Sequence, residues 1–305
     1  MVNVYILTGI VLSVVIITTI IYKKSSLIER NPDMVNKPTT AAIVFDLDQT
    51  LGEFTELSMF IESVGRYREE RGYTPLTTAM KFEIFDLFPQ VFRPDIFKII
   101  QNINTNINTN INTNINTNIN KSTKIYMYTN NQGDKEWPQL IADYFQHKLG
   151  YKVFEYVIAA FKNYKNIQVE QCRTTQEKTT EDFFACTKLP INKTQICFVD
   201  DLVHPRMRTN NVYYININPY HFSYPFADMA AKYYNMVSRK EIQNKSTNSA
   251  TYPIIDAGFN QTIIAYMKQY TNYPQSTLKS SSDDAEEQKI SKYLKHHIKV
   301  FLSTH

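Results

Sequence analysis

The chain has 305 residues, of which 43% are hydrophobic and 20% are charged, and this composition is that of an ordinary globular protein. The length suffices for one sizeable domain with extensions, or for two small domains. The net charge of +4 gives no reason to expect nucleic acid as a partner, because such binding needs lysine and arginine concentrated on one face.

The first 24 residues are predicted to form a membrane anchor. Between Val4 and Tyr22 there is no Asp, Glu, Lys, Arg or His, and a helix of about 20 apolar residues spans the hydrocarbon core of a bilayer. Basic residues follow this segment and none precedes it, so the positive-inside bias predicts a single-pass membrane protein whose large remaining part faces the cytosol. A cleaved signal peptide is the alternative, but no small-x-small cleavage site follows the apolar run.

A polar segment over 25–40, with two prolines, predicts a juxtamembrane linker. Beyond it, short apolar runs alternate with helical patterns over 41–226, which is typical of a doubly wound, mainly parallel α/β sheet. The predicted strands are 41–47, 124–128, 153–160, 194–199 and 212–217. Helical patterns lie between them, at 55–100, 137–149 and 181–188.

A repeat of Ile-Asn-Thr-Asn interrupts this domain over 102–120. Isoleucine alternating with polar residues imitates a strand. A perfect tetrad without other hydrophobic residues is more typical of a low-complexity loop. We therefore expect a loop or a loose hairpin at 102–120.

Three polar clusters follow predicted strands, at the carboxyl ends where α/β sheets bind their ligands. In chain order their members are Asp46 and Asp48, Thr129 and Asn130, and Asp200 and Asp201. A carboxylate can attack phosphorus, and a second carboxyl can act as general acid and base. Closely spaced acids also require a cation with oxygen ligands, such as Mg²⁺. Solvated acidic turns are the alternative interpretation of each acidic pair.

The three cysteines, Cys172, Cys186 and Cys197, are odd in number and lack the spacing of a metal site. We expect them to be buried, reduced thiols in a reducing compartment. This expectation agrees with a cytosolic location for the domain.

The three clusters resemble, in order and in strand context, the motifs of the haloacid dehalogenase (HAD) superfamily of phosphohydrolases. The segment from Asp46 to Thr50 resembles the D-x-D-x-T signature, Thr129 resembles the second motif, and Asp200-Asp201 resembles the fourth. The resemblance covers roughly 41–220.

The flanking sequence is closest to the branch called NLI-interacting-factor-like or C-terminal-domain-phosphatase-like. In that branch the first motif resembles DLDETL and an arginine-proline pair, here Arg93-Pro94, precedes the second motif. Gln49 stands in place of the usual glutamate, and the fourth motif is Asp-Asp in place of Asp-Asn, so the chain is more similar to the superfamily than to the branch. The Asn- and Ile-rich repeat also resembles proteins of large DNA viruses.

The resemblance implies an HAD-like Rossmannoid core and a Mg²⁺-dependent phosphatase that forms an aspartyl-phosphate. It implies that Asp46 is the nucleophile and Asp48 the general acid and base, and that Thr129, Asn130 and a lysine hold the phosphoryl group. The implied metal ligands are Asp46, Asp48 through its backbone carbonyl, Asp200 and Asp201. The family's lysine precedes a helix, which favours Lys178, while Lys188 and Lys193 remain alternatives.

The C-terminal residues 227–305 predict a helical extension that ends in an amphipathic helix over 284–302. We expect this helix to pack on the core, and the alternatives are that it pairs with a partner or lies on the membrane. The expected substrate is a phosphorylated protein or a small phosphate ester. The alternatives are a small-molecule phosphatase or nucleotidase, with residues 55–90 as a small cap, and a membrane-bound scaffold that keeps the fold without turnover.

Overall fold

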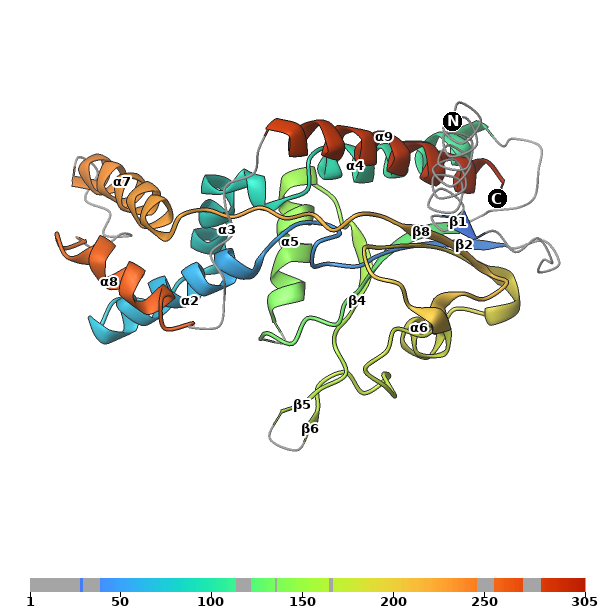
Figure 1. Ribbon diagram of the computed structural model, residues 1–305, viewed down its shortest axis with the longest axis horizontal. Helices are drawn as coiled ribbons and strands as arrows, with labels where there is room; N and C mark the ends of the chain where they lie inside the picture. Colours follow the sequence, from blue (N-terminus) through green and yellow to red (C-terminus); the bar gives the residue numbers. More distant parts are fainter. Residues whose placement is uncertain are drawn as a thin grey trace, which may run out of the picture.

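The computed structural model describes residues 28–29, 39–113, 122–134, 136–164, 167–245, 255–270 and 281–304. In this part of the chain, a sheet of five parallel strands lies between helices (Figure 1). The parallel strands are β2 (Thr40–Phe45), β3 (Ser122–Tyr128), β4 (Phe154–Ile158), β7 (Thr194–Asp200) and β8 (Val212–Asn216). The sequence prediction of an α/β fold with these five strands is confirmed.

The order of the strands is β1-β8-β7-β2-β3-β4, in which β1 (Ile28–Glu29) pairs antiparallel with β8 at one edge. The chain builds the sheet outward from β2 to β4, returns to the other side of β2, and then adds β7 and β8. The direction of winding therefore reverses between β2 and β7. Open α/β sheets bind ligands at such a switch point, beyond the carboxyl ends of the strands.

The central strand shows why the sheet forms in this way. Residues Ala42 to Phe45 of β2 have no exposed surface, because helices cover both faces of the sheet. A strand buried on both faces needs a continuous apolar run, and this run distinguishes it from the alternating pattern of a half-exposed strand. The strand ends where Asp46 and Asp48 begin the loop.

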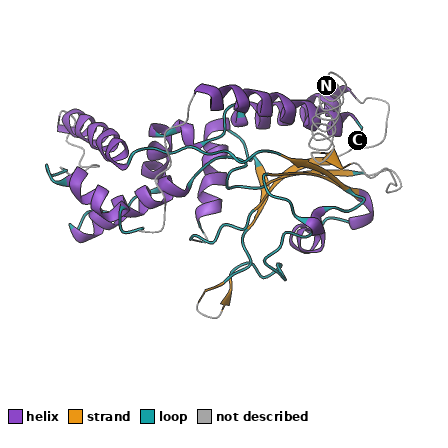
Figure 2. Cartoon of the chain, in the orientation of Figure 1, coloured by secondary structure: helices purple, strands orange, loops and turns teal. Residues whose placement is uncertain are grey.

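The helices divide into two groups. The helices beside the sheet are α4 (Ile96–Thr113), α5 (Trp137–Leu149), α6 (Thr180–Thr187) and α9 (Ser281–Ser303). The remaining helices pack on one another as a helical lobe at one end of the molecule (Figure 2) and comprise α2 (Thr55–Glu70), α3 (Thr78–Leu87), α7 (Phe226–Lys245) and α8 (Phe259–Met267). In the lobe, the ring of Phe259 lies 4.8 Å from the ring of Tyr67 and 5.6 Å from that of Tyr233, centroid to centroid.

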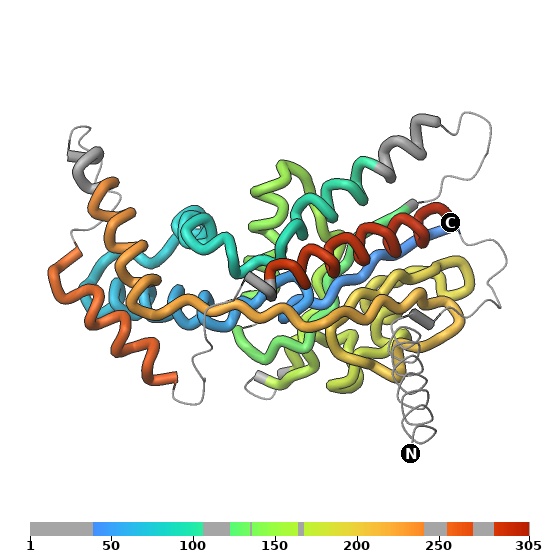
Figure 3. The backbone as a smooth tube through the Cα atoms, turned by 45° about the horizontal axis from the view of Figure 1, so that its top comes forward, coloured from blue at the N-terminus to red at the C-terminus, as the bar shows by residue number. Residues whose placement is uncertain are grey.

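The predicted C-terminal extension is split between these groups. Helices α7 and α8 join the lobe, whereas α9 returns to the sheet and contacts α4 and β8 (Figure 3). The apolar stripe of α9 is buried there, as Leu294 and Phe301 have no exposed surface. The amphipathic pattern of this helix therefore reflects packing on the core.

The predicted loop at the tetrad repeat is wrong for its first part, because α4 continues through the repeat to Thr113. A tetrad places isoleucine every four residues, close to the period of 3.6 residues per helical turn. Ile103, the first isoleucine of the repeat, is buried in the core. Residues 114–120 lie outside the described residues.

No helix in the described ranges is long and apolar enough to cross a membrane. The predicted anchor, residues 1–24, and most of the predicted linker, residues 25–40, lie outside those ranges. The anchor and its orientation stay predictions.

The prediction of three reduced thiols is wrong for two of the cysteines. Cys172 and Cys186 form a disulfide, and Cys197 is a free, buried thiol in β7. The turn after the short hairpin of β5 (Asn163–Tyr164) and β6 (Ile167–Gln168) brings Cys172 beside α6, with a Cα–Cα distance of 5.0 Å to Cys186. The spacing of the cysteines could not indicate this approach, and the disulfide removes the cysteine argument for a reducing compartment.

Candidate active site

The loop after β2, residues 46–54 and here called the β2 loop, carries the first acidic pair. It turns at Gln49, whose φ of 59° is left-handed and whose N–H donates to the carbonyl of Gly52 at 2.7 Å. The buried guanidinium of Arg93 donates to the carbonyls of Gln49 at 2.6 Å and of Thr50 at 2.8 Å. These bonds fix the path of the loop beyond the acidic pair.

Gly52 is required by the close approach of two backbones. A Cβ at this position would lie 2.3 Å from the carbonyl oxygen of Val91. We expect Gly52→Ala to lower the free energy of unfolding by about 1–3 kcal/mol, measured by urea denaturation, because the backbone must shift. Gly65→Ala in α2 is the control, since its Cβ would meet nothing within 4 Å and alanine favours a helix. Equal stability of the two variants would refute the steric argument.

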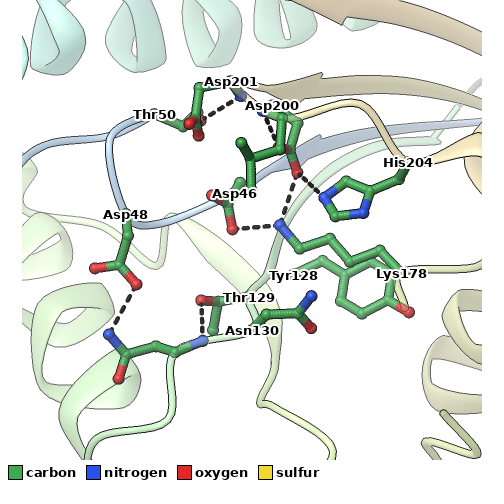
Figure 4. A network of polar contacts seen from close by, with 12 residues as sticks. Asp46, Asp48, Thr50, Tyr128, Thr129, Asn130, Lys178, Asp200, Asp201 and His204 are labelled. Atoms are coloured by element: carbon green, nitrogen blue, oxygen red, sulfur yellow. Dashed lines mark hydrogen bonds and ion pairs between the residues drawn. The ribbon is translucent and has the colours of Figure 1, made fainter. Parts of the chain in front are cut away.

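Lys178 joins the first and third clusters. Its ammonium is buried and donates to Asp46, and it donates to the Oδ2 of Asp200 at 2.7 Å (Figure 4). The imidazole Nε2 of His204 lies 3.4 Å from the same oxygen of Asp200. Asp46 directly follows β2 and Asp200 is the last residue of β7, and these two strands flank the switch point of the sheet.

Burial and charge act against each other in this group. Burial raises the pKa of Asp46 well above its ordinary value, although Lys178 opposes the shift. Burial acts on Asp200 in the same direction, but Lys178 and His204 outweigh it and lower the pKa of Asp200. Burial disfavours the charged form of Lys178, yet the two carboxylates raise its pKa. A further cation beside Asp46 would favour the carboxylate form of that residue.

Asp46, Asp200 and Asp201 have carboxylate oxygens that all lie within 4.8 Å of one another. Oxygen donors of this kind fit a hard divalent cation such as Mg²⁺. Asp201 is held in place by Thr50, whose hydroxyl donates to it at 3.0 Å. The carboxylate of Asp48 is not in this set, and the predicted ligand from Asp48 is its backbone carbonyl.

Asp48 lies on the side of Asp46 that is away from Lys178 (Figure 4). Its Oδ2 accepts a hydrogen bond of 2.8 Å from the side-chain amide of Asn131. Burial raises the pKa of Asp48 to about 6, and the bond from Asn131 limits the rise. A carboxyl with this pKa exchanges its proton close to neutral pH, as a general acid and base must.

Thr129 and Asn130 lie at the end of β3, on the same edge of the sheet. Thr129 is fully buried, and its hydroxyl oxygen accepts the N–H of Asn131 at 3.0 Å, which leaves the hydroxyl proton for an acceptor. The side-chain oxygen of Asn130 accepts a bond of 3.0 Å from Arg173. The second cluster is therefore part of the same site.

The segment 169–178, here called the lysine loop, depends on Arg173, which sequence reasoning missed. The buried guanidinium of Arg173 donates to the carbonyls of Thr175, Gln176 and Glu177 at 3.0–3.2 Å. An isolated arginine without a motif gives no sign of this role in the sequence. The loop it orders ends at Lys178.

The three candidate lysines occupy different places. Lys178 directly precedes Thr179, whose hydroxyl accepts the N–H of Asp182 and caps the start of α6. Lys188 is exposed at the far end of α6, and Lys193 is exposed just before β7 begins. The structure brings only the first of these three lysines to the carboxylates.

Comparison of the chain with family models, with curated proteins and with solved structures finds no match. The class of the protein therefore rests on the fold and the site. It is an α/β protein with a parallel sheet and a buried site of carboxylates and lysine at the switch point of the sheet.

Proposed function

We propose that this protein is a Mg²⁺-dependent phosphatase of the HAD type that acts through an aspartyl-phosphate, with phosphorylated proteins or small phosphate esters as substrates. The observation that carries the proposal is the group of Asp46, Lys178 and Asp200, with Asp48 on the opposite side of Asp46. The sequence further suggests that residues 1–24 anchor the enzyme in a membrane with its catalytic domain in the cytosol.

In this mechanism, an oxygen of Asp46 forms a bond to phosphorus while the bond from phosphorus to the leaving oxygen breaks. Asp48 donates its proton to the leaving oxygen. The resulting carboxylate then takes a proton from the water that attacks phosphorus and releases Asp46. The raised pKa of Asp48 supports this double role, because a group with a pKa of about 6 carries its proton at mildly acidic pH and gives it up close to neutral pH.

Charge neutralisation and positioning supply most of the rate in such a reaction. Lys178 would face the phosphoryl oxygens with its ammonium, and the hydroxyl of Thr129 would donate to one of them. Asp46, Asp200 and Asp201 would hold Mg²⁺, which supplies positive charge beside the phosphoryl group when it is bound.

Removal of the metal tests the proposal most directly. The full-length chain in detergent is expected to hydrolyse an aryl phosphate with Mg²⁺, and turnover is expected to fall about 100-fold or more in excess EDTA. Added Mg²⁺ should restore it, and circular dichroism should show the same fold in EDTA. Turnover that is insensitive to EDTA, or no turnover from folded protein, would contradict the proposal.

A further inference from the structure

A groove of about 1120 Å³ lies between the helical lobe and α5. One wall consists of α2, the turn after it and the start of α3. The other wall consists of Asp134, Glu136 and the first turns of α5 as far as Asp143. The groove is larger than a pocket for one small ligand, which measures about 300–1,000 Å³.

Two segments of the chain connect the candidate active site to the groove. Asn131 donates to Asp48, and Asp134, three residues later, lines the groove. On the opposite wall, Ser58 lines the groove from the first turn of α2, the helix that follows the β2 loop. A substrate whose phosphate reaches Asp46 would therefore have the groove on the Asp48 side of the site.

The described residues of the lining combine apolar surface with an excess of negative charge. Its apolar side chains are Ile61, Tyr73, Leu76, Trp137 and Leu140. Its acidic side chains, all exposed, are Glu62, Glu69, Asp134, Glu136 and Asp143. Among the residues of the lining that the structure describes, Arg66 and Lys81 are basic, and Arg66 forms an ion pair of 2.8 Å with Glu70.

We infer that this groove binds a basic polypeptide segment next to the phosphorylated residue, so that the preferred substrates are phosphoproteins with lysine or arginine beside the phosphorylated side chain. The inference rests on the proposed phosphatase function and narrows its substrates to one class. Long basic side chains can lay their methylene groups on the apolar floor and keep their charges near the acids. A metal ion is a poorer occupant, because the sets of metal ligands found among the described residues lie elsewhere.

A comparison of matched peptides tests the inference with the full-length chain in Mg²⁺. One peptide carries lysine and arginine around the phosphorylated residue, its partner carries glutamine there, and both are made with phosphoserine and with phosphotyrosine. We expect kcat/KM to be about tenfold higher for the basic peptide, and this preference should shrink in 0.5 M salt, where the Debye length is about 4 Å. Turnover of an aryl phosphate, which carries no peptide, reports the catalytic step independently of the groove.

A variant with two acidic residues of the groove changed to lysine tests whether the groove causes this preference. Glu69→Lys combined with Asp143→Lys is expected to reduce the preference to less than about twofold, mainly through KM, and to leave aryl phosphate turnover unchanged. Glu286→Lys, an exposed site on α9, is the matched control and should keep the preference.

Equal kcat/KM for the paired peptides, no peptide turnover, or a preference that survives charge reversal would overturn the inference while aryl phosphate turnover upholds the phosphatase. If folded protein turned over no substrate at all, both the proposed phosphatase function and the inference about the groove would be overturned.

Discussion

Asp46→Asn is expected to lower aryl phosphate turnover about 1,000-fold or more, to the background of the assay. An amide cannot form the aspartyl-phosphate, and loss of a nucleophile is among the largest single effects known in enzymes. The fold should survive, because Lys178 keeps its bond of 2.7 Å to Asp200. The measurement is the initial rate at saturating substrate and Mg²⁺, together with thermal unfolding of the same preparation.

A matched control is Asp143→Asn, an exposed acid of α5 that should keep aryl phosphate turnover within about twofold. If Asp46→Asn retained more than one-tenth of the activity, covalent catalysis by Asp46 would be excluded. If the unsubstituted chain were folded but inactive, and Asp46→Asn still captured the same partner protein, the chain would be a scaffold that uses the fold without turnover.

The sheet and its polar ends could be predicted because their signals are local. Each buried strand is a continuous apolar run, and the polar clusters directly follow the runs of β2, β3 and β7. Parallel strands bring their carboxyl ends to one edge, so local patterns were enough to predict that Asp46, Thr129 and Asp200 would meet. The choice of Lys178 over the other candidate lysines had weaker support from the sequence. The loop before it has no periodic pattern, and only the helix that follows it favoured this residue.

The features that sequence reasoning missed depend on partners distant in the chain. The sequence singles out Arg93 as part of an arginine-proline pair but does not indicate its contacts. These are with the β2 loop, 43 residues before it, and with Glu287 in α9, 194 residues after it. Cys172 and Cys186 meet only because the lysine loop folds back on α6. The helix through the tetrad repeat was missed for another reason, since the alternation of isoleucine with polar residues resembled a strand or loop more than a helical period of four.

Removal of the Glu287 carboxylate from α9 is expected to cause a large loss of stability, because this carboxylate pairs with Arg93. The guanidinium of Arg93 lies 2.7 Å from Glu287, both side chains are buried, and burial lowers the pKa of Arg93 while Glu287 opposes the shift. Glu287→Ala would leave a buried charge without this partner, which costs about 3–5 kcal/mol. We expect a decrease of that size in the free energy of unfolding in urea, and an intermediate decrease for Glu287→Gln, which keeps a hydrogen-bond acceptor.

Glu286→Ala, at the neighbouring exposed position of α9, should change stability by less than about 0.5 kcal/mol. Equal effects of the two alanine variants would mean that α9 contributes through its apolar stripe alone. Because Arg93 also holds the carbonyls of Gln49 and Thr50, Glu287→Ala is expected to lower aryl phosphate turnover under conditions in which the variant is fully folded. A loss of stability without that loss of turnover would show that the ion pair secures α9 to the core but does not position the β2 loop.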